Sequence, residues 1–167
     1  AENSVREIDL FLLSDGDTGR TRWIDAPLGY LEDARVNAQG DAVVVTARGR
    51  VATAYTGQQR RVDYRFPAED RARAAVFNAD GDTLFAILDA DDRGEVWSIP
   101  ANGQAEAQQV TRDSDAYIWS LIETPHENLL LYTDKKARLV GLNTQTGRTN
   151  VIDRTKSSFD QPFYDFA

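Results

Sequence analysis

The chain has 167 residues, of which 41% are hydrophobic and 10% aromatic, and this composition excludes a disordered polypeptide. Its net charge of −8 would repel a phosphate backbone, so we expect no nucleic-acid partner. No apolar run approaches the roughly 18–20 residues of a membrane span, and the absence of cysteine excludes disulfides and thiolate chemistry.

The first 27 residues read as the end of a β-sheet unit. Glu7–Leu13 partly alternates between apolar and polar side chains, as a half-buried strand does. Asp15–Gly19 has turn chemistry, and Thr21–Asp25 is a second strand. We therefore predict that residues 1–27 are the last two strands of a unit whose first two strands are missing, so that the chain opens within a unit.

Three complete units of four short strands are predicted next, over residues 28–68, 69–113 and 114–156. The middle unit shows the pattern most clearly, with strands at Arg73–Asn78, Thr83–Leu88, Glu95–Ile99 and Ala107–Thr111. Asp-Gly and Asn-Gly pairs between its strands are strong hairpin signals, because these residues tolerate a positive φ. Each unit is thus predicted to be an antiparallel meander.

A glycine recurs in the turn between the third and fourth strands of each unit, at Gly19, Gly57, Gly103 and Gly147. The steps are 38, 46 and 44 residues, about the length of one four-stranded propeller blade. The sequence therefore predicts an all-β fold, a partial β-propeller of three complete four-stranded antiparallel blades plus parts of the flanking blades. Residues 157–167 are predicted to be the first strand of a further blade.

An open arc of blades leaves the faces of its two end blades uncovered. Uncovered apolar faces of several hundred Å² usually bind a partner. We expect missing chain, a second copy, or other parts of a parent protein to complete the arc.

The segments Phe77–Gly81, Gly94–Pro100 and Gln109–Thr111 resemble the propeller repeat shared by the TolB protein and tricorn-type peptidases. Val43–Gly49, Thr133–Leu139 and Asn143–Gly147 are more similar to the seven-bladed propeller of tricorn-like serine peptidases. The third unit departs from the pattern, because Thr124–Asn128 lacks the glycine of the first turn. This resemblance implies a propeller that guides or filters peptides toward a buried active site, with the nucleophile in separate domains.

Candidate chemistry in the chain itself is sparse. His126 is the one histidine and falls in a predicted hairpin turn, where a solvated side chain is the favoured interpretation over a catalytic base. Asp89–Glu95 could suggest calcium, but Pro100 stands where a calcium loop of the helix-loop-helix type needs glutamate, so a solvated turn is favoured. Arg48–Arg50 and Arg60–Arg61 could bind a peptide carboxylate, although surface ion pairs are the favoured interpretation. We predict no catalytic residue, no cofactor and no metal in this segment.

The first strand of each propeller blade lines the axial channel. Arg35, Arg73 and Trp119 lie on these predicted strands, and we predict that their side chains face the channel. The placement rests on the register of the repeat.

Three functions remain open. The first is a non-catalytic propeller segment of a tricorn-like serine peptidase, with peptides or unfolded polypeptide as partners of the parent protein. The second is a TolB-like module that binds a protein partner without peptidase activity, and the third is a propeller attached to another hydrolase. The compartment is either the cytoplasm or the periplasm.

Overall fold

The computed structural model of the chain describes residues 23–56, 61–67, 71–89 and 93–155. A short 3-10 helix, η2 (Pro27–Tyr30), precedes twelve strands that form three four-stranded antiparallel sheets. Blade 1 contains β1 (Leu31–Val36), β2 (Ala42–Ala47), β3 (Arg50–Tyr55) and β4 (Val62–Asp63). Blade 2 contains β5 (Ala72–Phe77), β6 (Thr83–Leu88), β7 (Glu95–Pro100) and β8 (Gln108–Gln109). Blade 3 contains β9 (Ile118–Glu123), β10 (Leu129–Asp134), β11 (Arg138–Asn143) and β12 (Thr149–Arg154).

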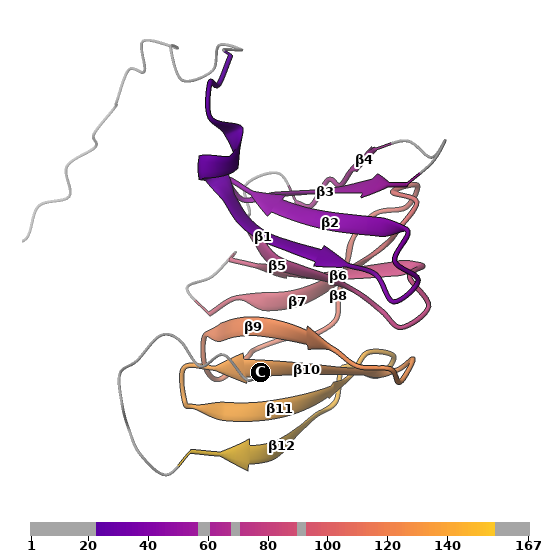
Figure 1. Ribbon diagram of the computed structural model, residues 1–167. Coiled ribbons are helices and arrows are strands. Elements are labelled where there is room, and N and C mark those ends of the chain that lie inside the picture. Colours follow the sequence, from indigo (N-terminus) through magenta and orange to yellow (C-terminus); the bar gives the residue numbers. More distant parts are fainter. Residues whose placement is uncertain (1–22, 57–60, 68–70, 90–92, 156–167) are drawn as a thin grey trace, which may run out of the picture.

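The three sheets follow one another in space as they do in the chain, and Figure 1 shows blade 2 between the other two. In every sheet the strands are ordered as in the sequence, so the first and fourth strands are the edges. The principal contacts between neighbouring sheets all involve the first strand of a blade, β5 or β9. The sheets therefore meet along their first strands, and the predicted partial propeller is confirmed.

Two layers of side chains hold the blades together. Between blades 1 and 2, Val44 and Val51 pack with Phe77, Leu84 and other buried residues of the middle sheet. Between blades 2 and 3, a second set packs from both sheets; it contains Val76, Phe85, Ile87, Val96, Ile118, Leu121, Leu130, Tyr132, Val140 and Leu142. The middle sheet thus buries both faces, and β6 is buried from Leu84 to Leu88.

The turn between the first two strands is the same structure in blades 1 and 2. Asn37 Oδ1 accepts from the backbone N–H groups of Asp41 and Ala42, while its Nδ2 donates to Asp41 at 2.7 Å. Asn78 makes the same bonds to Asp82 and Thr83 in blade 2. These asparagines satisfy backbone donors that the turn would otherwise leave unpaired.

Two predictions at the ends of the chain differ in outcome. Residues 1–22 and 157–167, predicted to belong to flanking blades, lie outside the described residues. Within the described part, Trp23–Asp25 is not in a strand, so the predicted strand at Thr21–Asp25 is wrong over these residues. Pro27 starts η2 directly afterwards, because its ring fixes φ near the helical value.

Candidate interaction site at the inner rim

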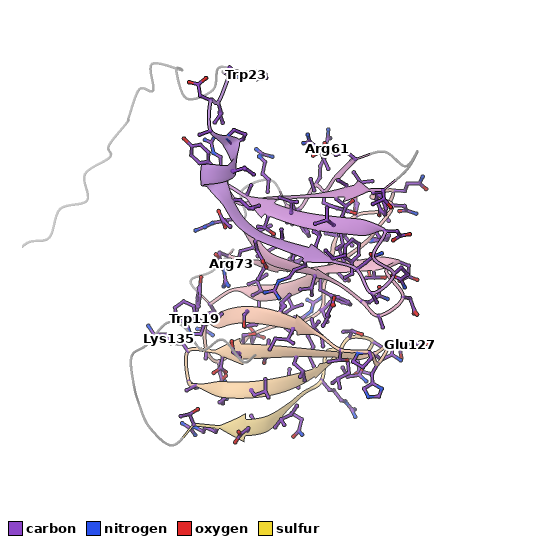
Figure 2. The ribbon with its side chains drawn as sticks, in the orientation of Figure 1. Trp23, Arg61, Arg73, Trp119, Glu127 and Lys135 are labelled. Carbon is purple, nitrogen blue, oxygen red and sulfur yellow. The ribbon has the colours of Figure 1, made fainter. Side chains whose placement is uncertain are left out.

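One end of the three blades gathers charged and aromatic side chains. Antiparallel order places the starts of the first strands and the turns between second and third strands at the same end of every sheet. We call this end the inner rim and define it by Tyr30, Glu32, Arg48, Arg71, Arg73, Asp89, Tyr117 and Trp119. Figure 2 shows Arg73, Trp119 and Lys135 close together at this end, with Glu127 at the opposite end.

Arg73 is the best-fixed side chain of the rim. Its Nε donates to both carboxylate oxygens of Asp89 at 2.9 Å. Its Nη1 donates to the carbonyl of Trp119 at 3.0 Å, and its Nη2 to the carbonyl of Ile118 at 2.6 Å. The guanidinium also lies 4.3 Å from the ring centroid of Tyr117. Only 11% of the side chain is exposed, so Arg73 joins blade 2 to the first strand of blade 3.

An irregular first strand supplies the carbonyls that Arg73 binds. Pairing between β9 and β10 shifts at Trp119, which is an extra residue in its strand. Such a bulge interrupts the ladder locally and leaves backbone groups for other partners. Gly94 keeps the space open, because a Cβ there would lie 2.9 Å from Arg73 Nη2. The bulge and the glycine together make room for the guanidinium.

Smaller contacts continue the rim into blade 1. Arg71 forms an ion pair with Glu32 at 3.0 Å, which links blade 2 to blade 1. Arg48 lies over the ring of Tyr30 at 5.2 Å from its centroid. Tyr117 and Trp119 pack edge to face with ring centroids 4.8 Å apart. Tyr30 and Trp119 nevertheless keep 46% and 42% of their surface exposed, so part of each side chain is accessible to a partner.

The three side chains predicted to face the channel do not form one cluster. Arg73 and Trp119 meet at the rim through the bond described above. Arg35 lies further along β1, where its Nε donates to Asp33 at 3.1 Å. Burial raises the pKa of the Glu123 carboxyl, and the positive charge of Arg35 offsets part of that rise. Arg35 of blade 1 is thus close enough to influence the first strand of blade 3.

A separate charged cluster fixes the turn between β10 and β11. The buried carboxylate of Asp134 accepts from the backbone N–H of Lys136 at 2.9 Å and from Arg138 Nε at 2.7 Å. Arg138 and Lys136 also bind the exposed Asp115 and hold the pKa of its carboxyl well below the usual range. Every member has a partner of opposite charge, so this cluster stabilises the turn.

The remaining sequence candidates are dispersed. His126 is exposed in the turn before β10, and its backbone N–H donates to Thr124 Oγ1 at 3.2 Å. Within Asp89–Glu95, Asp89 binds Arg73, and Glu95 accepts from the N–H and hydroxyl of Ser114. Arg61 pairs with Asp63 of its own strand region. Among the described residues no group of three or more acidic or histidine side chains is arranged to hold a metal ion.

Most residues of the inner rim were not predicted from the sequence. Tyr30, Arg71 and Tyr117 stand seven residues before Asn37, Asn78 and Thr124, the first residues of the three equivalent turns. Glu32, Arg73 and Trp119 stand five residues before the same three turns. Aligning the repeats on these turns would have grouped them, whereas Arg35 belongs to a different position of the repeat.

Comparison with known proteins identifies similar folds but no protein family. No protein-family model matches the chain, and no curated protein matches its sequence. Among solved structures, a putative TolB from Agrobacterium tumefaciens is similar over 74% of this chain, with a TM-score of 0.59 and 11% identity. A nidogen/laminin complex is similar over 74% of the chain, with a TM-score of 0.60 and 16% identity. The tricorn protease is similar over 78%, with a TM-score of 0.57 and 15% identity.

These similar structures are β-propellers, and at such identities they establish the fold alone. The chain covers 46% of the TolB chain, 48% of the matched chain in the nidogen/laminin complex and 13% of the tricorn protease. The chain therefore spans about half of the length of the first two matched chains. No helix in the described ranges is long and apolar enough to cross a bilayer.

Proposed function

We propose that this chain is a non-catalytic wall of a β-propeller that binds extended polypeptide at its inner rim. The exposed rings of Tyr30 and Trp119, set among the arginines of blades 1 and 2, carry this proposal. Aromatic and arginine side chains are enriched where proteins bind proteins, since they offer large contact areas and bidentate donors. A propeller holds such side chains in fixed positions on rigid strands.

The parent protein that fits best is a tricorn-like serine peptidase. The repeat motifs of the chain resemble that family, and its solved structure is among the similar folds. In such a protein the propeller would guide peptides toward a catalytic domain that this chain does not contain. The reading frame is then expected to contain a domain with a serine nucleophile.

A TolB-like interaction module is the second candidate. The same exposed aromatic rings would then bind a folded protein partner, and the similarity to the putative TolB favours it. A reading frame that encodes a complete propeller and no peptidase domain would support this candidate against the first.

Peptide binding can be measured directly. We expect a fluorescently labelled, unstructured peptide with a free carboxyl terminus to bind the chain and to increase in anisotropy. Trp119→Ala should weaken the binding about fivefold, which corresponds to roughly 1 kcal/mol for a lost aromatic contact. Trp23→Ala is the matched control, because Trp23 is an exposed tryptophan outside the sheets. Equal binding by the two variants would contradict a role for the inner rim.

A further inference from the structure

The two end blades each keep one sheet face free of the other described blades. Alternate residues of β10 are buried against blade 2, and the others are half-buried on the opposite side. We call that opposite side the open face of blade 3; it comprises Leu129, Leu131, Thr133, Leu139, Gly141 and Ile152. The open face of blade 1 comprises Leu31, Ala34, Val36, Val43, Val45 and Ala47.

The rim contacts between blades follow a rule. The residue five before the first turn of one blade contacts the residue seven before that turn in the next blade. Glu32 pairs with Arg71 across blades 1 and 2, and Arg73 stacks on Tyr117 across blades 2 and 3. Among the described blades, Trp119 of blade 3 has no following blade and Tyr30 of blade 1 has no preceding blade with which to make this contact. Both are exposed aromatic rings, which suit one another as a stacked pair.

A second repeated contact points to the same arrangement. In blades 2 and 3, the turn between the third and fourth strands lies on the fourth-strand region of the preceding blade. At Gly103 a Cβ would lie 2.6 Å from Val62 of blade 1, and at Gly147 it would lie 2.5 Å from the carbonyl oxygen of Val110 in blade 2. The hydroxyl of Tyr64 in blade 1 also donates to the carbonyl of Ala101 at 2.6 Å.

The corresponding position on blade 3 is a hollow of about 410 Å³. Its lining includes Gly141, Asn150 and Ile152, and Gly141 pairs with Asn150 as Thr53 pairs with Val62 in blade 1. The hollow therefore has the position that receives the glycine turn of a following blade. A further blade could therefore pack on blade 3 in the same register as blade 2 packs on blade 1.

Side-chain size indicates which blade fits. The open face of blade 3 presents large side chains such as Leu129, Leu131 and Ile152. That of blade 1 presents mainly alanine and valine, with Leu31 at one end. Large and small side chains on facing layers fill space without strain. The matched part of this chain spans 46% and 48% of the putative TolB and nidogen/laminin chains, so the matched parts of two copies would together span about the length of either one.

We propose that blade 3 of one copy packs on blade 1 of a second copy, with Trp119 stacked on Tyr30 of that copy. The contact is head to tail, so two copies can close one ring of six blades by using it twice. The second copy continues the blade series in the register that blades 1 to 3 already follow. This inference goes beyond the proposed peptide binding and does not depend on it.

The mass of the chain in solution tests the proposal. Light scattering during size-exclusion chromatography, at tens of micromolar protein, should give at least twice the protomer mass of 18.6 kDa. Ile152→Arg should reduce the mass to that of one chain, because it places a charge on the open face of blade 3. Val151→Arg is the matched control, since Val151 is a neighbour of similar exposure that pairs opposite Val140, on the other face. A monomeric chain, or an oligomer that persists in Ile152→Arg, would overturn the proposal.

Cross-linking identifies the contact itself, and the absence of native cysteine makes it specific. Trp119→Cys mixed with Tyr30→Cys should form a disulfide-linked pair under mild oxidation, whereas either variant alone should give little. Equal cross-linking in the single variants would overturn the head-to-tail arrangement. Both proposals use the rings of Tyr30 and Trp119, so peptide anisotropy is measured on Ile152→Arg, in which the second copy does not cover these rings. Failure of this proposal and failure of the proposed function can then be told apart.

Discussion

Arg73 satisfies three needs of the inner rim with one side chain. It neutralises Asp89, it binds two carbonyls that a bulge frees from the ladder, and it stacks on Tyr117. Its planar fork suits these partners in a way that an ammonium group would not. Arg71 lies two residues away, yet its pair with Glu32 is largely exposed. The two arginines therefore differ in energetic importance although both connect blades.

Arg73→Ala should destabilise the chain by about 2–4 kcal/mol, because it leaves a largely buried carboxylate and two carbonyls without their donor. Arg71→Ala should cost about 0–1 kcal/mol, as exposed ion pairs do. Urea unfolding followed by circular dichroism measures both values. A similar loss in the two variants would show that the bonds of Arg73 add little.

At the scale of the elements, the turns between third and fourth strands of blades 2 and 3 contact the preceding blade. Gly147 has a φ of +69° and touches the backbone of blade 2, whereas Gly40 has a φ of +73° and open space around its Cα. Both positions therefore have the left-handed backbone conformation that glycine adopts freely. Only at Gly147 would a Cβ also lie against the backbone of the neighbouring blade. The recurrent glycine detected in the sequence serves packing between blades as well as turn conformation.

Gly147→Ala should cost more than Gly40→Ala. Alanine in the left-handed region costs about 1–2 kcal/mol at either position. At Gly147 the new Cβ would also press on the carbonyl oxygen of Val110, which should add about 1–3 kcal/mol, as overpacking does. Comparing the two free energies of unfolding isolates the contact between blades. Equal losses of unfolding free energy in the two variants would show that the structure relaxes around a Cβ at position 147 without cost.

At the scale of the whole molecule, the described residues form a short series of similar sheets, and among these residues only the middle sheet buries both faces. Each sheet contacts its neighbours, so stability accumulates along the series as in repeat proteins. Within the described residues blades 1 and 3 each have a face that no other blade covers, and under our proposal a second copy covers them. The stability of the molecule should consequently depend on whether the faces are covered.

The midpoint of thermal unfolding should rise with protein concentration, by a few degrees for each tenfold increase, because association stabilises the folded state. In Ile152→Arg the midpoint should be independent of concentration. Differential scanning fluorimetry over a hundredfold range checks both expectations. A constant midpoint in the unaltered chain would exclude coupling between folding and association.

Local patterns were enough to predict the strands, the turns and the four-strand unit. Asp80-Gly81 and Asn102-Gly103 have the positive-φ glycines that the hairpin signals require, and apolar runs such as Thr83–Leu88 form strands. The extended reading of Trp23–Asp25 failed, because a short apolar run contains no information about whether a partner strand pairs with it.

The candidate site was harder to predict, and the reason is physical. The sequence determined which residues begin each first strand and that the blades repeat, since hydrogen bonding and burial within a sheet depend on neighbours close in the chain. Only the tertiary structure decided that Arg73 binds the carbonyls of Ile118 and Trp119, and that Tyr30 and Trp119 remain uncovered. Those contacts join residues about 45 positions apart, and their geometry depends on how one twisted sheet lies on the next.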